Sequence, residues 1–381
     1  MQITYPHFGS LTYVFECLMR GLGRDDVIIP YKPSKKTAEL GSRYSPEFIC
    51  TPFKLTLGTF IEGLERGATE LAIGGCHAYC RFGYYWPVQK LILQNLGYKK
   101  FTFKTINYDE PLGIVRDLKN NFSADISYTR ILKVLRRVWR VNRLTDLVDQ
   151  LKYHYRALEI VKGQTDALAE KAYRMIVEAS SNIHDIRELQ DILPAMFRKN
   201  IAIRENDYPL RIAVVGEIYV VQEPALNLDI FRKLNKLGVI TESPVSLRRY
   251  CDIGRKLNPF KKMEFEKADK AAKPFLEYRV GGETQESIGD TILYRRRGWD
   301  GMIHLYPFTC MPEIISRSIL PEISATYDMP VLSLVVDEQT GETGFQTRLE
   351  AFVDLLLRRR EEKGRRKLTG IEIVKNREVL Y

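Results

Sequence analysis

Short apolar runs alternate with helical patterns at the start of the chain, and this alternation limits the fold more than any other feature of the sequence. Residues 70–75 and 101–106 are short apolar runs typical of strands, whereas residues 52–68 and 83–97 have the apolar periodicity of helices. Strands separated by helices of this length pair in parallel through right-handed crossovers. We therefore predict a parallel α/β domain over residues 1–122.

The same alternation returns in the second half, after a purely helical stretch. Residues 144–161 and 166–180 repeat apolar positions with a helical period and lack a strand signal. Strand patterns then recur at 211–216, 301–307 and 330–337, separated by helical patterns. The sequence thus predicts an α/β protein with two Rossmann-like (flavodoxin-like) parallel-sheet domains, 1–122 and 207–381, joined by a helical bridge over 123–206.

Two local predictions belong to the second domain. Residues 223–238 have the pattern of one helix, with Pro224 near its start and Gly238 just past its end. Residues 252–285 are rich in lysine and glycine, and we expect an irregular surface segment there.

Composition narrows the protein classes. The chain has no run of 18 apolar residues and no basic start followed by an apolar stretch, so we predict neither a membrane span nor a secretory signal, and place the protein in the cytoplasm. Its six cysteines are widely spaced. A disulfide scaffold is not expected in such a chain, and the thiols are better suited to metal binding or redox chemistry.

A basic segment raises the question of an anionic partner. The formal net charge is +10, and residues 130–143 contain six basic residues and no acidic one. Nucleic acid or another anion could bind such a segment. The apolar residues within it recur at helical spacing, however, so a solvated basic helix face is the favoured interpretation, and nucleic acid is not an expected partner.

Two cysteines stand in the same local pattern: an apolar run, a cysteine, any residue and a proline. They are Cys50, in "FICTPF", and Cys310, in "LYPFTCMPE". Proline suits the first turn of a helix, so we expect helices to begin at Pro52 and Pro312. A thiol just before such a helix faces free N–H groups and the positive end of the helix dipole, and we expect both to favour the thiolate.

Two further cysteines, Cys76 and Cys80, follow the predicted strand 70–75 at the edge where ligands bind in open α/β sheets. Four thiolates from the two domains would hold one 4Fe–4S cluster or a tetrahedral zinc. The alternative is that several of these cysteines are buried apolar residues. We expect that role for Cys17 and favour a structural role for Cys251. Weaker candidates near the thiols are His77 as a ligand, Gly74 and Gly75 for close backbone approach, and Lys54, Arg81 and Arg348 as compensating cations.

The sequence lacks several catalytic motifs. It has no G-x-x-x-x-G-K-[ST] phosphate loop, no G-x-G-x-x-G after a strand, no G-x-S-x-G and no H-E-x-x-H. We therefore do not expect the chain itself to be an ATPase or a nicotinamide-dependent enzyme.

Four segments together resemble a known family: 45–68, 74–98, 306–320 and 331–356, which include "FICTPFKLTLGTF", "GGCHAYCRFGYYWP" and "YPFTCMPEIISRSIL". They are similar to 2-hydroxyacyl-CoA dehydratase-like iron–sulfur proteins, in particular the acyl-CoA dehydratase activase-related branch and the double-cubane cluster proteins. The resemblance implies a 4Fe–4S cluster, or a larger double cubane, between Rossmann-like domains. Cys50, Cys76, Cys80 and Cys310 match the family's cluster segments, although the C-x3-C spacing of Cys76 and Cys80 departs from the tighter family pattern.

The resemblance also implies a function. Relatives receive low-potential electrons from a separate ATP-dependent activase with an actin-like fold, and they act with a sister subunit or a second copy on acyl-CoA-type substrates. We therefore expect an iron–sulfur reductase or electron-transfer component, with an oxidoreductase or dehydratase role. The alternative is an assembly or structural protein that holds zinc or a cluster without catalysis of its own.

Overall fold

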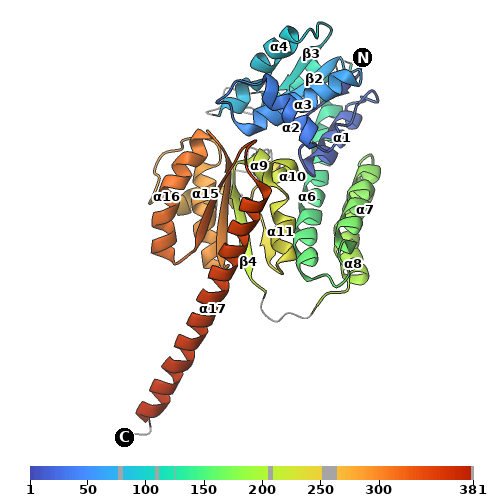
Figure 1. The fold of residues 1–381 in the computed structure, drawn as a ribbon. Helices are drawn as coiled ribbons and strands as arrows, with labels where there is room; N and C mark the ends of the chain where they lie inside the picture. Colours follow the sequence, from blue (N-terminus) through green and yellow to red (C-terminus); the bar gives the residue numbers. More distant parts are fainter. Residues whose placement is uncertain (76–79, 108–110, 124, 205–208, 251–263, 379–381) are drawn as a thin grey trace.

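Two parallel sheets organise the computed structural model (Figure 1), which describes residues 1–75, 80–107, 111–123, 125–204, 209–250 and 264–378. The first sheet has the strand order β1-β2-β3, and the second has the order β5-β4-β6-β7, with every neighbouring pair parallel. The predicted α/β class with two parallel sheets is confirmed.

The first unit is built on the smaller sheet. It contains β1 (Ile3–Thr4), α1 (Leu11–Gly21), α2 (Lys35–Tyr44), α3 (Thr51–Glu65), β2 (Glu70–Gly74), the 3-10 helix η1 (Arg81–Tyr84), α4 (Tyr85–Asn95), β3 (Thr102–Ile106), α5 (Pro111–Asp117) and the π-helix η2 (Leu118–Phe122). Alternate residues of β2 face opposite layers, as the pleat of a strand requires. Leu71 and Ile73 pack with α3 and α4, whereas Ala72 packs with α1 and η2.

The second unit surrounds the larger sheet. It contains β4 (Arg211–Gly216), α9 (Ile218–Gln222), α10 (Pro224–Asn227), α11 (Ile230–Lys236), β5 (Ile240–Glu242), α12 (Leu247–Tyr250), α14 (Glu264–Ala272), α15 (Thr284–Arg296), β6 (Gly301–Pro307), α16 (Met311–Tyr327), β7 (Val331–Val336) and α17 (Glu342–Glu378). Helices cover both faces. Val214 packs in the layer that holds α11 and α17, and Val215 in the layer that holds α15. The continuous apolar runs of β4 and β6 follow from this burial on both sides.

Three helices, α6 (Tyr128–Leu158), α7 (Gln164–Ala179) and α8 (Ile183–Asn200), form the middle of the chain, as the sequence predicted. They stand beside the two sheets in Figure 1 and share an apolar core with α1. Helix α6 also contacts α11 of the second unit, where Arg156 Nε donates to Asn235 Oδ1 at 2.9 Å. Because α6 touches both units, the division of the chain at residues 122 and 206 stays a prediction.

Several local predictions were wrong. The single helix expected over 223–238 is interrupted at Leu228 and Asp229, both with φ of 53°, and Asn227 Oδ1 accepts from Ile230 N at 3.3 Å so that α11 begins anew. Residues 264–272 form helix α14 within the segment expected to be irregular. Helix α2 was missed although Ser34 and Thr37 form a capping box at its start.

The C-terminal helix α17 packs against the second sheet through its first turns and then extends away from the rest of the molecule (Figure 1). None of the helices in the described ranges is both long and apolar enough to cross a membrane.

Candidate functional site

Each of the three described candidate cysteines is the residue immediately before a helix. Cys50 precedes α3, Cys80 precedes η1 and Cys310 precedes α16, and all three have extended backbone conformations. The helices after Cys50 and Cys310 begin one residue earlier than predicted, so that proline occupies the second helical position, where its missing N–H costs no hydrogen bond. The predicted turn is therefore present twice, and Cys80 adds a third example without a proline.

Hydrogen bonds between the two units join the residues that flank these cysteines. Arg81, next to Cys80, donates to the carbonyl oxygen of Phe48 at 3.3 Å and to that of Thr309. Thr309 Oγ1 in turn donates to the same Phe48 oxygen at 3.3 Å. The chain segments around Cys50, Cys80 and Cys310, which are far apart in sequence, therefore meet at the boundary between the two units.

Thr309 has a backbone conformation that threonine rarely adopts. Its φ of 66° lies in the left-handed region, which is unfavourable for a β-branched residue. Such conformations concentrate where the fold must place a neighbouring side chain. Here the neighbour is Cys310, which follows strand β6 at the carboxyl edge of the second sheet.

Helix α3 forms much of this boundary. Its side chains are buried almost all round: Phe53, Leu57 and Phe60 pack in the first unit, whereas Leu55 packs in the core of the second. At its start, Thr51 Oγ1 donates to Val336 O of β7 at 3.3 Å. The buried Lys54 forms an ion pair with Glu338 just beyond β7, so it neutralises that carboxylate and not the thiols.

The thiols are less acidic than their positions at helix starts predicted. Burial raises the pKa of Cys80 to about 12 and also raises those of Cys50 and Cys310. Backbone groups at Phe53, Phe82 and Glu313 act in the opposite direction, as expected at a helix start, but their effect is smaller than that of burial. The prediction that these turns yield thiolates was therefore wrong for the protein without a bound cation.

Three glutamates that the sequence interpretation missed act electrostatically on the thiols: Glu283 and Glu313 are buried, and Glu217 is half-buried. Glu217 ends the turn after β4, Glu283 precedes α15, and Glu313 lies in the first turn of α16. Their negative charges raise the pKa of Cys310, and those of Glu217 and Glu283 also raise the pKa of Cys80. The three carboxyl groups therefore share one electrostatic environment with the cysteines.

The carboxyl groups differ in their partners. Glu217 accepts hydrogen bonds from Tyr219 N at 3.1 Å and Val220 N at 2.8 Å, yet burial raises its pKa to about 7, with a further contribution from Glu313. Burial, followed by the charges of Glu217 and Glu313, also raises the pKa of Glu283. A carboxyl group with the pKa of Glu217 is only partly ionised at neutral pH.

Glu313 is fully buried, and only one of its two carboxyl oxygens has hydrogen-bond partners among the described residues. Its Oε2 lies 2.6 Å from Nε2 of the equally buried His304 and accepts from Ser287 Oγ at 3.0 Å. Its Oε1 has no hydrogen-bond partner within the described part of the chain. A buried carboxylate oxygen without a donor is costly, and a cation or a further donor beside Cys310 would relieve that cost.

The described thiol and carboxyl groups at this boundary are chemically suited to a thiophilic metal, but they are not gathered closely enough in this structure to share one. Across the ranges that the structure describes, no three His, Cys, Asp or Glu side chains are close enough together to hold a metal ion. Cys50 is instead engaged with Tyr85, because its Sγ lies 2.6 Å from Tyr85 Oη. A shared metal would require the Cys50 side chain to leave Tyr85 and turn toward Cys80 and Cys310.

The remaining candidates separate into distinct groups. Cys76 and His77, as well as Cys251, lie outside the described residues, although Gly75, next to Cys76, is held at the edge of the first sheet by a hydrogen bond from its N–H to Ile106 O at 3.0 Å. Arg81 is at the boundary, where its positive charge partly offsets the burial that raises the pKa of Cys50. Arg348 is an exposed residue of α17.

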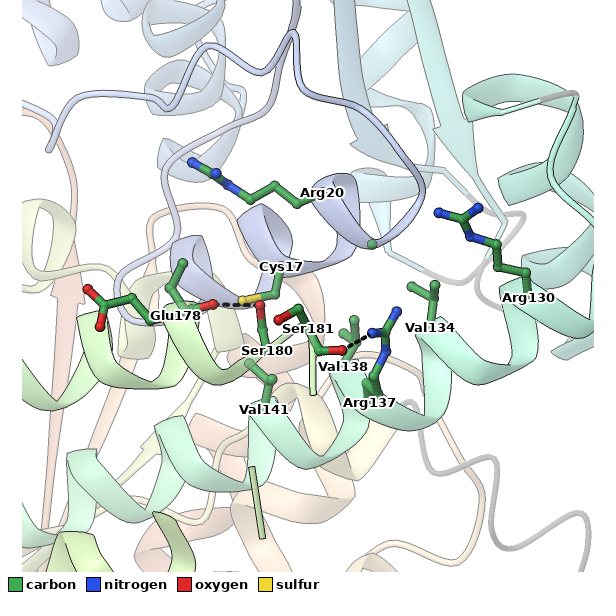
Figure 2. A pocket seen from close by; sticks show the side chains of 12 residues that line it. Cys17, Arg20, Arg130, Val134, Arg137, Val138, Val141, Glu178, Ser180 and Ser181 are labelled. Atoms are coloured by element: carbon green, nitrogen blue, oxygen red, sulfur yellow. Dashed lines mark hydrogen bonds between the residues drawn. The ribbon is translucent and has the colours of Figure 1, made fainter. Parts of the chain in front are cut away.

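Cys17 is separate from this site, as predicted. It is buried among α1, α6 and α7, where it faces Ser180 at the side of a cavity (Figure 2). Burial raises its pKa to about 11. Its packing in the apolar core makes it a suitable control for experiments on the other cysteines.

One of the missed glutamates had a usable sequence signal. Glu217 directly follows the strand "RIAVVG", and a polar residue at the carboxyl end of a buried parallel strand is a site candidate. Glu283 and Glu313 lacked a comparable signal, since their burial comes from packing between α15 and α16.

Comparison with known proteins adds no assignment. No protein-family model matches this chain, and no curated protein matches it at a significant level.

Proposed function

We propose that the chain binds an iron–sulfur cluster at the boundary between its two α/β units and acts as a low-potential reductase or electron-transfer component. The observation that carries this proposal is the set of hydrogen bonds by which Arg81, Phe48 and Thr309 join the flanks of the buried Cys50 and Cys310 and the half-buried Cys80. The ligands would be Cys50, Cys80 and Cys310, with Cys76 as the fourth.

The acidic groups around the thiols favour the binding of a positively charged ligand. Cys50 and Cys310 are nearly inaccessible to solvent, and the acidic groups around them include Glu217, Glu283 and Glu313. Thiolate sulfur is the donor that iron–sulfur clusters use, and burial together with nearby charge sets their potential. When bound, the cluster would supply a one-electron carrier.

The chain's own groups have definable roles in such a site. Arg81 places a positive charge beside Cys50 and ties the two units together. Glu217, with a pKa near 7, can hold or release a proton at neutral pH, which suits a reduction that couples electron and proton uptake. Tyr85 would hold the Cys50 thiol until a metal replaces that hydrogen bond.

Exposed apolar side chains next to the cysteines support an electron-donating partner. Phe48 is 70% exposed, Phe308 50% and Met311 55%, and each lies within two residues of Cys50 or Cys310. Exposed apolar groups around a buried redox site are suited to protein docking. In line with the sequence resemblance to 2-hydroxyacyl-CoA dehydratase-like proteins with Rossmann-like domains, we propose an ATP-dependent, actin-fold activase as the donor, a sister subunit or second copy as a further partner, and an acyl-CoA-type compound as the acceptor.

The test is metal and sulfide analysis of protein expressed and purified without oxygen. We expect bound iron and acid-labile sulfide, and a paramagnetic signal after reduction. Cys50→Ser and Cys310→Ser should each remove most of the iron, because each loses a ligand that the other unit cannot replace. Cys17→Ser is the matched control and should retain it.

Two outcomes would contradict the proposal. Equal iron content in Cys17→Ser, Cys50→Ser and Cys310→Ser would show that the boundary cysteines do not bind the cluster. Colourless protein with stoichiometric zinc and no sulfide would instead support the structural or assembly role that the same thiols could serve.

A further inference from the structure

In a second region of the molecule, several arginine side chains lie around one cavity with few acidic side chains near them. Arg140 and Arg143 of α6, together with Arg187 of α8 and Arg248 of α12, line a cavity of about 260 Å³. Among the described residues that line it, Asp146 is the one with an acidic side chain. The cavity is far in sequence from Cys50, Cys80 and Cys310, and two of its arginines, Arg140 and Arg143, belong to the basic segment that the proposed function leaves unexplained.

Three of these arginines have no acidic partner in the part of the chain that the structure describes. Arg140, Arg143 and Arg187 form no ion pair with any residue in the described ranges. Asp146 is already engaged, because its Oδ2 accepts from Ser246 Oγ at 2.8 Å and lies 3.6 Å from Arg248 Nε. The lining therefore carries a net positive charge that the described protein does not compensate.

Arg140 carries the most direct sign of a missing ligand. Its Nη1 is buried from solvent and lacks a hydrogen-bond acceptor among the described residues. Burial, followed by repulsion from Arg136, Arg187 and Arg143, lowers the pKa of Arg140. A merely solvated helix face would leave the guanidinium groups apart and in water, where neither effect arises.

The neighbouring cavity on the same helix provides a contrast. It is larger, about 540 Å³, and is lined by Arg20, Arg130 and Arg137 (Figure 2). There Arg137 donates to Ser181 O, and Arg20 forms an ion pair with Glu16 at 2.8 Å. Two of its three arginines thus already have a hydrogen-bond acceptor or an ion-pair partner, so this larger cavity is the weaker candidate for binding an anion.

We propose that the smaller cavity, lined by Arg140, Arg143 and Arg187, binds a phosphoryl group. Guanidinium groups present planar pairs of donors that match two phosphate oxygens at once, and they keep their charge when partly buried. The cavity also has apolar walls from Leu144, Leu147 and Ile186, which confine the anion to the arginine side. The small volume and the single engaged aspartate favour a compact oligophosphate over a long nucleic acid. This proposal does not depend on the cysteine site.

Isothermal titration calorimetry with sodium tripolyphosphate, in a phosphate-free buffer and on the full chain, tests the proposal. Wild type should bind at one site. Arg187→Gln and Arg140→Gln should each weaken binding roughly tenfold or more, as expected when one charge-assisted hydrogen bond is lost. Arg187 is exposed, so its replacement should not affect folding even if that of Arg140 does.

The matched control is Arg198→Gln, which makes the same change on the same helix at an exposed position outside the cavity. Its affinity should equal that of wild type. Titrations with ATP and with coenzyme A identify the source of the phosphoryl group. Tighter binding of either one, lost in Arg187→Gln, would assign the site to a nucleotide's phosphates, and binding of tripolyphosphate alone would assign it to the free anion.

Three results would overturn the proposal. One is the absence of binding by all three phosphoryl compounds. Another is an equal loss of affinity in Arg198→Gln and Arg187→Gln, which would indicate a diffuse charge effect. The third is much tighter binding of a single-stranded oligonucleotide that Arg130→Gln weakens as much as Arg187→Gln does, because that result would make the whole basic face of α6 a nucleic-acid interface.

Discussion

Glu223 connects the start of the chain to the second unit, and its removal should destabilise the protein strongly. Its Oε2 lies 2.7 Å from His7 Nδ1 and accepts from Gly9 N at 2.9 Å, while its Oε1 accepts from Ala225 N at 3.1 Å. Tyr219 Oη adds a hydrogen bond to His7 O. Glu223 and His7 are both buried, so water cannot replace these contacts.

The expected magnitude follows from what Glu223→Ala leaves behind. Two backbone N–H groups and the His7 ring lose their acceptor in a buried place, and α10 loses its N-terminal cap. A buried donor left without its acceptor costs about 1–3 kcal/mol, and loss of a cap about 1 kcal/mol, with overlap between the two because the same carboxylate serves both. We therefore expect the free energy of unfolding to fall by about 4 kcal/mol.

Urea unfolding, followed by far-UV circular dichroism and tryptophan fluorescence, measures this change. Trp86 lies in the first unit and Trp299 in the second, so fluorescence samples both. Glu342→Ala is the matched control: Glu342 pairs with Lys233 but is largely exposed, and its removal should leave the midpoint unchanged. Equal midpoints for Glu223→Ala and Glu342→Ala would refute the reasoning.

Two further predictions concern Glu217, at the boundary between the units, and the crossing of α2 and α3. The pKa of Glu217 is raised in the folded, metal-free protein, so the folded state binds more protons than the unfolded state between about pH 4.5 and 7. The free energy of unfolding of wild type should therefore fall by roughly 3 kcal/mol as the pH rises through that window. Glu217→Gln should reduce this slope in urea unfolding from pH 5 to pH 8, whereas an unchanged slope would show that Glu217 does not titrate there. Gly58→Ala would place a Cβ 2.0 Å from Thr37 O where α2 crosses α3, so it should lower stability by about 1–3 kcal/mol, whereas Gly341→Ala meets open space and should have no effect. Identical melting curves for these two glycine variants would contradict the close helix crossing.

The parallel strands were predictable because their signal is local. The segment "GMIHLYP" forms β6 over the residues expected, since a strand buried on both faces is apolar throughout and is bounded here by glycine and proline. The break between α10 and α11 was not predictable from periodicity. The side chain of Asn227 donates to Val220 O and Val221 O and accepts from Ile230 N, and these contacts replace the helix continuation that the apolar pattern suggested.

The candidate site was predictable in its local geometry but not in its environment. The Cys-x-Pro pattern correctly located Cys50 and Cys310 before helices, because proline near a helix start is a property of the backbone. Their protonation depends instead on burial, which arises only when α3 is enclosed by both units. No local pattern contains that information.

Charge balance at the boundary connects these observations. Among the described residues there, the charge of Arg81 acts on Cys50, the carboxyl groups of Glu217, Glu283 and Glu313 act on Cys310, and Lys54 is already paired with Glu338. Burial, with a smaller contribution from the charges of neighbouring carboxyl groups, raises the pKa values of Cys80 and Glu217 and so favours their protonated forms. A metal cation would reverse this balance, because each thiol that becomes a ligand must release its proton. If the boundary binds a metal as proposed, each ligand thiol would have to release its proton, so metal uptake there would be coupled to proton release.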